Sequence, residues 1–112
     1  MKDQNERGTN SMYIVHSMVH VPKGKADEVI AIYQNRSRLV DTFEGFEAFH
    51  LLQNDKRPEE LTVHMQWVDK AAYMKWVTSE AFKHVHDLEK NYPDQELAAI
   101  VPKVSKYQVV AS

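Results

Sequence analysis

The chain has 112 residues, enough for one domain with a modest core, because a chain of this length buries roughly two thirds of its unfolded surface. Its net charge of −2 argues against a nucleic-acid binder that works by neutralising phosphates. No stretch approaches the ~20 apolar residues of a membrane span. The lack of cysteine excludes disulfides, thiolate metal sites and a cysteine nucleophile.

The first eleven residues are polar, mixed in charge and without periodicity. They predict a disordered leader over residues 1–11 that lacks the apolar segment of a secretory signal. We expect a single domain over residues 12–112. Without a secretory signal, a membrane span or cysteines, the chain is expected to be cytoplasmic.

The first strand is expected over residues 12–21, where neither set of alternating side chains is cleanly polar. Such a strand is typical of a sheet that is covered on both faces. Helices would supply one covering layer and a second copy of the chain the other, which predicts a homodimer. Ser17 is the only aliphatic hydroxyl in its otherwise apolar or aromatic row.

A turn at residues 22–24 leads into a helix expected over residues 25–38, with apolar residues recurring every three or four positions. Arg36 and Arg38 would lie near its last turn, where the helix dipole favours cations. Gly45 then marks a turn in which glycine adopts a conformation that other residues avoid.

Two strands are expected over residues 46–53 and 60–67, joined by a polar hairpin loop at residues 54–58. Asp69 and Ser79 are natural N-caps for two consecutive helices, because a short polar side chain can accept a hydrogen bond from a free backbone N–H.

The second of these helices runs to about Asn91, where Tyr92-Pro93-Asp94 breaks it. Residues 96–101 are ambiguous, and a last strand is expected over residues 104–111. The order is therefore β-α-β-β-α-β, which is the pattern of a ferredoxin-like α+β sandwich.

The histidines do not form a metal-ligand pattern. His16 and His20 would share a strand face but lie about 13 Å apart. His84 and His86 are two positions apart on a helix and would point about 200° away from each other.

Residues 66–86 are rich in aromatic side chains, and they form either a corner of the core or the wall of a pocket for a flat, apolar ligand. Phe82 and His86 share one helical face, so His86 is either a hydrogen-bonded core residue or a ligand to something in a pocket. Trp76 either packs in the core or presses on a planar ligand. Ser17 bonds either to neighbouring backbone or into the pocket.

The sequence resembles the haem-degrading monooxygenases of the IsdG type, in the antibiotic-biosynthesis-monooxygenase superfamily, from about residue 12 to residue 110. The resemblance rests on three motifs: Glu44-Gly45-Phe46, Trp67-x-x-Lys70-x-x-Tyr73-x-x-Trp76 and Ser79-Glu80-Ala81-Phe82-Lys83-x-x-His86. It implies a homodimer whose ferredoxin-like subunits meet in a central α/β-barrel arrangement.

The resemblance also implies that haem is both substrate and cofactor. The porphyrin ring is opened with dioxygen and electrons from an external donor, supplied by an unknown reductase, and iron is released. His86 would be the axial iron ligand, Trp76 would ruffle the porphyrin, and Phe82 and Tyr73 would line its site. The family's third pocket residue is an asparagine seven positions before the turn glycine, where this chain has Ser17.

Two other functions remain open on the sequence. One is a cofactor-independent monooxygenase acting on an aromatic or polyketide-like molecule, with His86 as a base and Trp76, Tyr73 and Ser17 positioning the substrate. The other is a dimeric haem-binding protein without catalysis. The fold alone does not separate these functions.

Overall fold

The structure, a computed structural model, describes residues 11–112, so the expected leader lies outside the described residues except for Ser11. Four antiparallel strands form one sheet in the order β2-β3-β1-β4. Their bounds are Tyr13–His20 for β1, Phe46–Gln53 for β2, Glu60–Trp67 for β3 and Lys103–Gln108 for β4.

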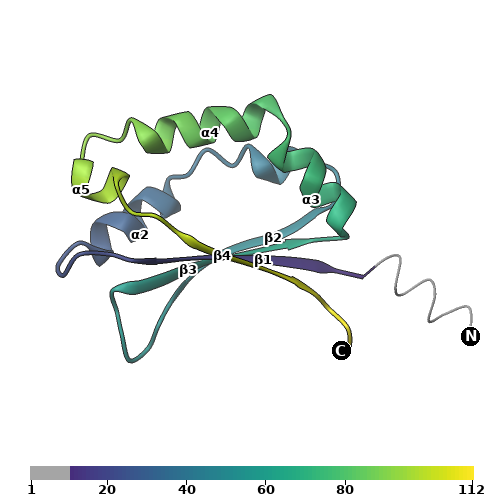
Figure 1. Cartoon of the computed structure of the whole chain (residues 1–112), viewed down its shortest axis with the longest axis horizontal. Helices are drawn as coiled ribbons and strands as arrows, with labels where there is room; N and C mark the ends of the chain where they lie inside the picture. Colours follow the sequence, from purple (N-terminus) through teal and green to yellow (C-terminus); the bar gives the residue numbers. More distant parts are fainter. Residues whose placement is uncertain (1–10) are drawn as a thin grey trace, which may run out of the picture.

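The helices all lie on one side of this sheet, and the opposite side is left open (Figure 1). They are α2 at Ala26–Gln34, the 3-10 turn η1 at Val40–Thr42, α3 at Lys70–Val77, α4 at Glu80–Lys90 and α5 at Gln95–Ala98. This arrangement confirms the predicted ferredoxin-like α+β fold. We expected the first strand to be covered on both faces. Within one chain, the helices cover one face of the strand and the other face is open.

The hairpin of β2 and β3 has the predicted bounds, because its loop closes on itself. Asn54 Oδ1 accepts hydrogen bonds from the backbone N–H groups of Lys56 at 2.8 Å and Arg57 at 3.0 Å. A side chain that mimics a turn carbonyl in this way stops both strands at defined residues. The first and last strands are shorter than the predicted ranges 12–21 and 104–111, and the last strand starts one residue earlier.

The predicted helix over residues 25–38 is wrong at its C-terminal end, since α2 stops at Gln34. Arg38 has a positive φ of 62°, which no α-helix contains. Arg36 and Arg38 therefore do not sit in the last turn of a helix. Arg36 instead reaches Asp41, with two nitrogen–oxygen distances of 2.8 and 3.2 Å. A paired carboxylate holds this guanidinium instead of the helix dipole.

Both predicted N-caps are confirmed. Asp69 accepts from the backbone N–H of Ala72 at 2.9 Å, and Ser79 accepts from that of Phe82 at 3.1 Å. The ambiguous stretch 96–101 contains most of the short helix α5, which Asp94 caps.

The register decides which side chains face the helices. Ser17 lies opposite Val63 on β3 and opposite Val104 on β4, on the face that the helices cover. His16 lies opposite His64 and therefore on the open face. Because facing residues point to the same side of a sheet, β1 divides between the two layers by alternation, whereas β2 has an irregularity between Phe46 and Ala48.

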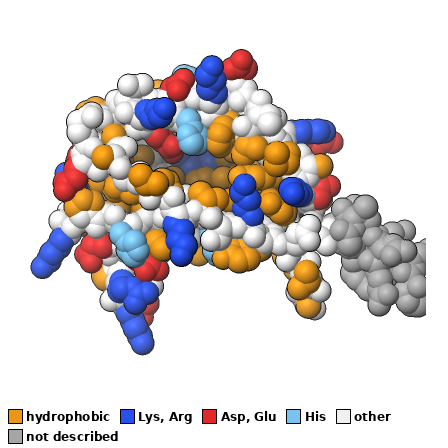
Figure 2. Space-filling model, viewed as in Figure 1, with side chains coloured by type: hydrophobic (Ala, Val, Ile, Leu, Met, Phe, Trp, Pro, Cys, Tyr) orange, Lys and Arg blue, Asp and Glu red, His pale blue; other side chains and the backbone are white. Residues whose placement is uncertain are grey.

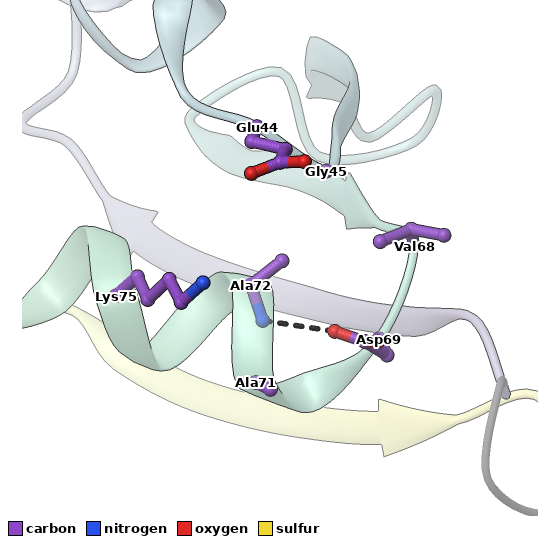
Figure 3. Close-up of a pocket in the computed structure, with 7 residues that line it drawn as sticks. All are labelled: Glu44, Gly45, Val68, Asp69, Ala71, Ala72 and Lys75. Carbon is purple, nitrogen blue, oxygen red and sulfur yellow. Dashed lines mark hydrogen bonds between the residues drawn. The ribbon is translucent and has the colours of Figure 1, made fainter.

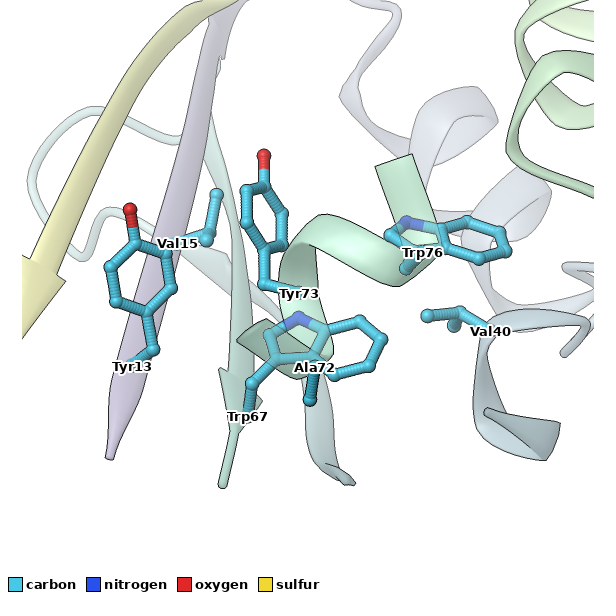
Figure 4. Packing of buried hydrophobic residues seen from close by; sticks show 7 residues of the cluster. All are labelled: Tyr13, Val15, Val40, Trp67, Ala72, Tyr73 and Trp76. Carbon is cyan, nitrogen blue, oxygen red and sulfur yellow. The ribbon is translucent and has the colours of Figure 1, made fainter. Parts of the chain in front are cut away.

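The buried side chains under the helices form two separate clusters. The larger one surrounds Trp67 and Trp76 and is shown in Figure 4. The smaller one consists of Val21, Val29 and Leu61. Val63, in the middle of β3, is 8% exposed and belongs to neither cluster. The core is thus divided near the centre of the sheet.

Candidate functional site

The joint between α3 and α4 sets the position of the aromatic wall. The Ser79 hydroxyl donates to the backbone carbonyl of Trp76 at 2.6 Å and accepts from the N–H of Phe82 at 3.1 Å. One side chain therefore ties the end of α3 to the start of α4. The tie holds the rings of Trp76 and Phe82 edge to face, with centroids 5.5 Å apart.

The aromatic contacts continue along α4 and end at an imidazole. The rings of Phe82 and His86 are 4.4 Å apart, and Phe43 contacts Trp76 from the other side at 5.0 Å. Trp76 is only 4% exposed, whereas His86 is exposed to solvent. Three predicted site residues thus form one row that runs from the core to an accessible nitrogen-bearing ring.

The other two predicted residues lie apart from this row. Tyr73 is 8% exposed and packs against Tyr13 at 5.5 Å and Trp67 at 6.1 Å, inside the larger buried cluster. Ser17 is half-buried on the helix-facing side of β1. Its neighbour Val104 is 51% exposed, so this part of the covered face is reached by solvent.

A hollow opens between α4 and the sheet. Although α4 is amphipathic, none of its side chains is fully buried, and the helix contacts mainly α3. Figure 2 shows the hollow from one side, with largely hydrophobic walls and a histidine at its edge. An apolar recess with a few polar groups at its margin is the usual form of a small-molecule site.

Tyr33 of α2 and Arg36 of the segment after it both pack on Phe49 of β2. The guanidinium carbon of Arg36 lies 3.9 Å from the ring centroid of Phe49, and this side chain is only 16% exposed. The ring of Tyr33 is 6.0 Å from the same phenylalanine. The sequence prediction missed Arg36 because it placed this residue on a regular helical turn. A glycine or proline that would mark the earlier helix end is absent there.

Ionisable groups of α2 and α4 influence each other. Burial raises the pKa of Tyr33 to about 12, and the Glu89 carboxylate contributes to the rise. Loss of hydration also raises the pKa of Glu89, although its side chain remains open to water, and His86 opposes that rise. A group in a recess behaves in this way, because protein surrounds it on most sides without sealing it.

Among residues 11–112, no three His, Asp or Glu side chains are placed so that they could hold one metal ion. An iron that reached His86 would therefore take its remaining ligands from the molecule that carries it. The donor set fits haem, in which the porphyrin supplies four nitrogens and a protein imidazole supplies an axial one.

Two other recesses, both partly open to solvent, lie elsewhere among the described residues. One of about 230 Å³ sits beside the N-terminus of α3, where Asp69 caps Ala72 (Figure 3). The other, of about 210 Å³, lies near Gly24 and Pro58. Neither contains a predicted site residue, and both are smaller than the ~300 Å³ of a typical ligand pocket. The open-sided hollow under α4 is therefore the better candidate.

Similarity to known proteins is extensive. The sequence profile of the antibiotic biosynthesis monooxygenase family matches residues 12–88. A Listeria monocytogenes protein named "Heme-degrading monooxygenase" is 32% identical over 93 residues, which cover 75% of this chain and 77% of that protein. A Listeria welshimeri protein of the same name is 29% identical over 111 residues, covering 88% and 92%.

The fold is shared with solved structures. The heme-degrader MhuD from Mycobacterium tuberculosis superposes with a TM-score of 0.69 at 21% identity, covering 90% of this chain and 97% of that one. Within the described residues, no helix has the length and apolar character needed to cross a membrane.

Proposed function

The chain belongs to the antibiotic biosynthesis monooxygenase family, and from this membership we propose that it is a haem-degrading monooxygenase. It would open the porphyrin ring oxidatively with dioxygen and electrons from an external donor, and release iron. The names of the Listeria relatives support this reaction. The observation that carries it is the row Trp76–Phe82–His86 on α3 and α4, which ends in an accessible imidazole.

His86 is the proposed iron ligand. Its ring is exposed and is held by stacking on Phe82, so a nitrogen can reach a ligand without a rearrangement of the core. Bound haem supplies the iron at which dioxygen is activated. The chain's own contribution is to present this ring from α4, the start of which is capped by Ser79.

Trp76 is the proposed residue that bends the porphyrin. In this structure its indole packs between Phe43 and Phe82 and presents almost no surface. Direct contact with a planar ligand therefore requires that Phe82 and the start of α4 move away. Such a shift would break the contact of Phe82 with Trp76 and disturb the packing of Ala81 and Val85 against the larger cluster.

Ser17 and Arg36 act on other parts of the ligand. Ser17, on the helix-facing side of β1, offers a short hydroxyl that can donate a hydrogen bond toward oxygen. The guanidinium of Arg36 lies over Phe49 and is paired with Asp41, so a carboxylate substituent of the ligand would have to compete with that ion pair for it. Tyr73 and Phe82 contribute apolar wall.

The remaining partners belong to the same proposal. Two copies pair through the open sheet face, and a separate reductase delivers electrons to a protein that works in the cytoplasm. The small core of a 112-residue chain and the uncovered strands support the pairing.

The test is a titration of the purified protein with haemin, followed in the Soret region, with ascorbate and catalase added at the end. We expect a saturable shift at one haem per chain and then bleaching. His86→Ala should abolish or sharply weaken axial ligation. The matched control is His84→Ala, an exposed histidine on the same helix, which should titrate as the unaltered protein does. An unchanged haem spectrum in His86→Ala would remove the ligand assignment.

A cofactor-independent monooxygenase is the second candidate. It is favoured by the burial of Trp76 and by serine at position 17, where the resembled family has asparagine. In that case His86 would act as a base toward an aromatic substrate. Oxygen consumption with a quinol-type compound in a protein that ignores haemin would select it. Binding of haemin without bleaching would instead select a non-catalytic haem-binding protein.

A further inference from the structure

A row of imidazoles crosses the open face of the sheet. His50 on β2 lies opposite His64 on β3, His64 lies opposite His16 on β1, and His16 lies opposite Ser105 on β4. The His50 and His64 rings are 6.1 Å apart, and those of His64 and His16 are 5.1 Å apart. The row cannot be seen in the sequence, because His16 and His50 are 34 positions apart and His50 and His64 are 14 positions apart. The three residues meet only through strand pairing.

Two members of the row share a hydrogen bond. His16 Nε2 lies 3.0 Å from His64 Nδ1. One ring must donate and the other accept, so the bond exists only while at least one imidazole is neutral. Protonation of both rings removes the acceptor and leaves two cations in contact.

The surroundings of the pair disfavour its positive charge. Burial, and to a smaller extent the neighbouring His64, lower the pKa of His16 below its ordinary value of 6.5. From β4, the ring of Tyr107 lies 5.4 Å from that of His16, and from β2 the facing group is His50. Among the described residues, no carboxylate lies within the row itself. 

The other charged groups on this face lie at its margins. Glu47 on β2 accepts a hydrogen bond from Gln66 at 3.3 Å, and Lys103 on β4 lies opposite Met18. At the far end of β1, His20 lies opposite Glu60, whose pKa is lowered first by its bonds from Asn54 and Arg57 and only weakly by His20.

The pattern of the face fits a second copy of the same chain. Glu47 and Lys103 occupy opposite corners, and the remaining corners carry Leu52 and Tyr107, which are 46% and 50% exposed. A two-fold axis through the two apolar corners would bring Glu47 against the partner subunit's Lys103 twice. It would also bring the histidine row of one copy against that of the other. A self-complementary patch of this kind is what an isologous dimer requires.

We propose that the row His50–His64–His16 makes the pairing of two copies through this face dependent on pH, with a stable dimer at neutral pH and dissociation on acidification. The inference rests on the homodimer of the proposed function and adds its regulation. Pairing removes water from imidazoles that are already in contact, so the dimer favours their neutral form.

The direction follows from linkage. Burial already lowers the pKa of His16 in the single chain. Pairing removes more water from this ring, so its pKa is lower again in the dimer, which binds fewer protons and weakens as the pH falls through the pKa of the free chain. If pairing lowers the pKa of one imidazole in each copy by one unit, full acidification weakens the dimer tenfold for each copy, or about 100-fold for the pair.

The experiment is sedimentation equilibrium of the full chain at pH 7.5, 6.5 and 5.5, with far-UV circular dichroism at each pH to show that the chain remains folded. We expect the dissociation constant to rise about 100-fold across this range. His64→Gln, which cannot become charged, should reduce the change to tenfold or less. The matched control is His20→Gln, an exposed residue at the end of the same face, which should keep the full change.

A dissociation constant that is independent of pH, or a pH dependence that survives in His64→Gln, would overturn the proposal. If His64→Gln fails to fold, His16→Gln gives the same reading, because it removes the other ring of the hydrogen-bonded pair. A chain that is monomeric at every pH would also overturn it. Haemin binding at His86 is measured separately, so a failure here is distinguishable from a failure of the proposed haem chemistry.

Discussion

At the scale of single residues, Trp76 and His86 differ in burial and therefore in role. Trp76 is 4% exposed and belongs to the larger buried cluster, whereas His86 is exposed and its ring contacts that of Phe82. Trp76 therefore serves the core as well as the site, and His86 serves mainly the site.

Substitution should separate these two roles. Trp76→Ala is expected to lower the free energy of unfolding by about 3–5 kcal/mol, because a large buried ring is lost. His86→Ala should change it by no more than about 0.5 kcal/mol, as expected for an exposed side chain. Urea unfolding of the haem-free protein measures both. Equal losses in the two variants would contradict the division of roles.

Gly45 and Gly24 provide a matched pair for measuring steric overlap. Both have positive φ, 87° and 88°, but a Cβ on Gly45 would lie 2.5 Å from that of Ala72, whereas one on Gly24 would meet nothing within 4 Å. Gly24→Ala should cost about 1–2 kcal/mol from backbone conformation alone. Gly45→Ala should cost about 2–5 kcal/mol, because overlap adds to that strain. Equal costs in urea unfolding would show that α3 moves aside freely.

Tyr33 should be the last tyrosine to ionise. Its pKa is raised to about 12, so absorbance at 295 nm should show a late step that Tyr33→Phe removes. The sign for stability follows from the raised pKa. The stabilisation is complete below the ordinary value of 10 and is lost as the pH rises from 10 to about 12. A titration that ends near pH 10 would contradict the packing of Tyr33 beside Glu89.

At the scale of elements, local chemistry decided which bounds could be predicted. The hairpin loop after Gln53 and the caps Asp69 and Ser79 act through neighbours in the chain, so β2, β3 and the starts of α3 and α4 were predicted correctly. The end of α2 depends on Asp41, which draws Arg36 out of the helical path. The hydrophobic pattern of the sequence does not reveal this contact between Arg36 and Asp41.

The candidate site was predictable only in part for the same reason. Trp76, Phe82 and His86 lie on consecutive helices, and their contacts follow from helical spacing. Arg36 over Phe49, and His16 beside His64, depend on contacts between distant segments. Such pairs follow from the sheet register and from tertiary packing, which no local pattern encodes.

The helix α4 should be the least protected helix of more than two turns. It has no fully buried side chain and leans mainly on α3, so we expect its amides to exchange with solvent by local opening. Ser79→Ala, which removes its cap, should cost about 1 kcal/mol and speed that exchange selectively. Asp69→Ala is the control, because loss of the α3 cap should weaken the packed end of the domain. Hydrogen exchange followed by mass spectrometry resolves the two, and uniform protection of both helices would contradict the expectation.

At the scale of the whole molecule, the core is divided, so we expect a bound ligand to increase the stability of the folded chain. The two buried clusters do not merge under the helices, and the hollow lies beside α4. A ligand that binds only the folded chain stabilises it by about 2.7 kcal/mol when its free concentration is 100 times the dissociation constant.

Haemin should therefore raise the melting temperature of the unaltered chain. His86→Ala should lose most of that rise at the same haemin concentration, whereas His84→Ala should retain it. Differential scanning calorimetry measures the three proteins under one condition. A rise that is the same in all three would indicate that haemin stabilises the chain without using the proposed ligand.

The placement of every described helix on one side of the sheet has a consequence for how ligands and donor proteins would reach a dimer. Two copies joined through their open faces would carry their hollows on opposite outer surfaces. Each would be loaded and emptied independently, with hyperbolic occupancy and no competition for an entrance. Two donor proteins could dock at once without meeting, so the supply of electrons to one copy would not limit its partner.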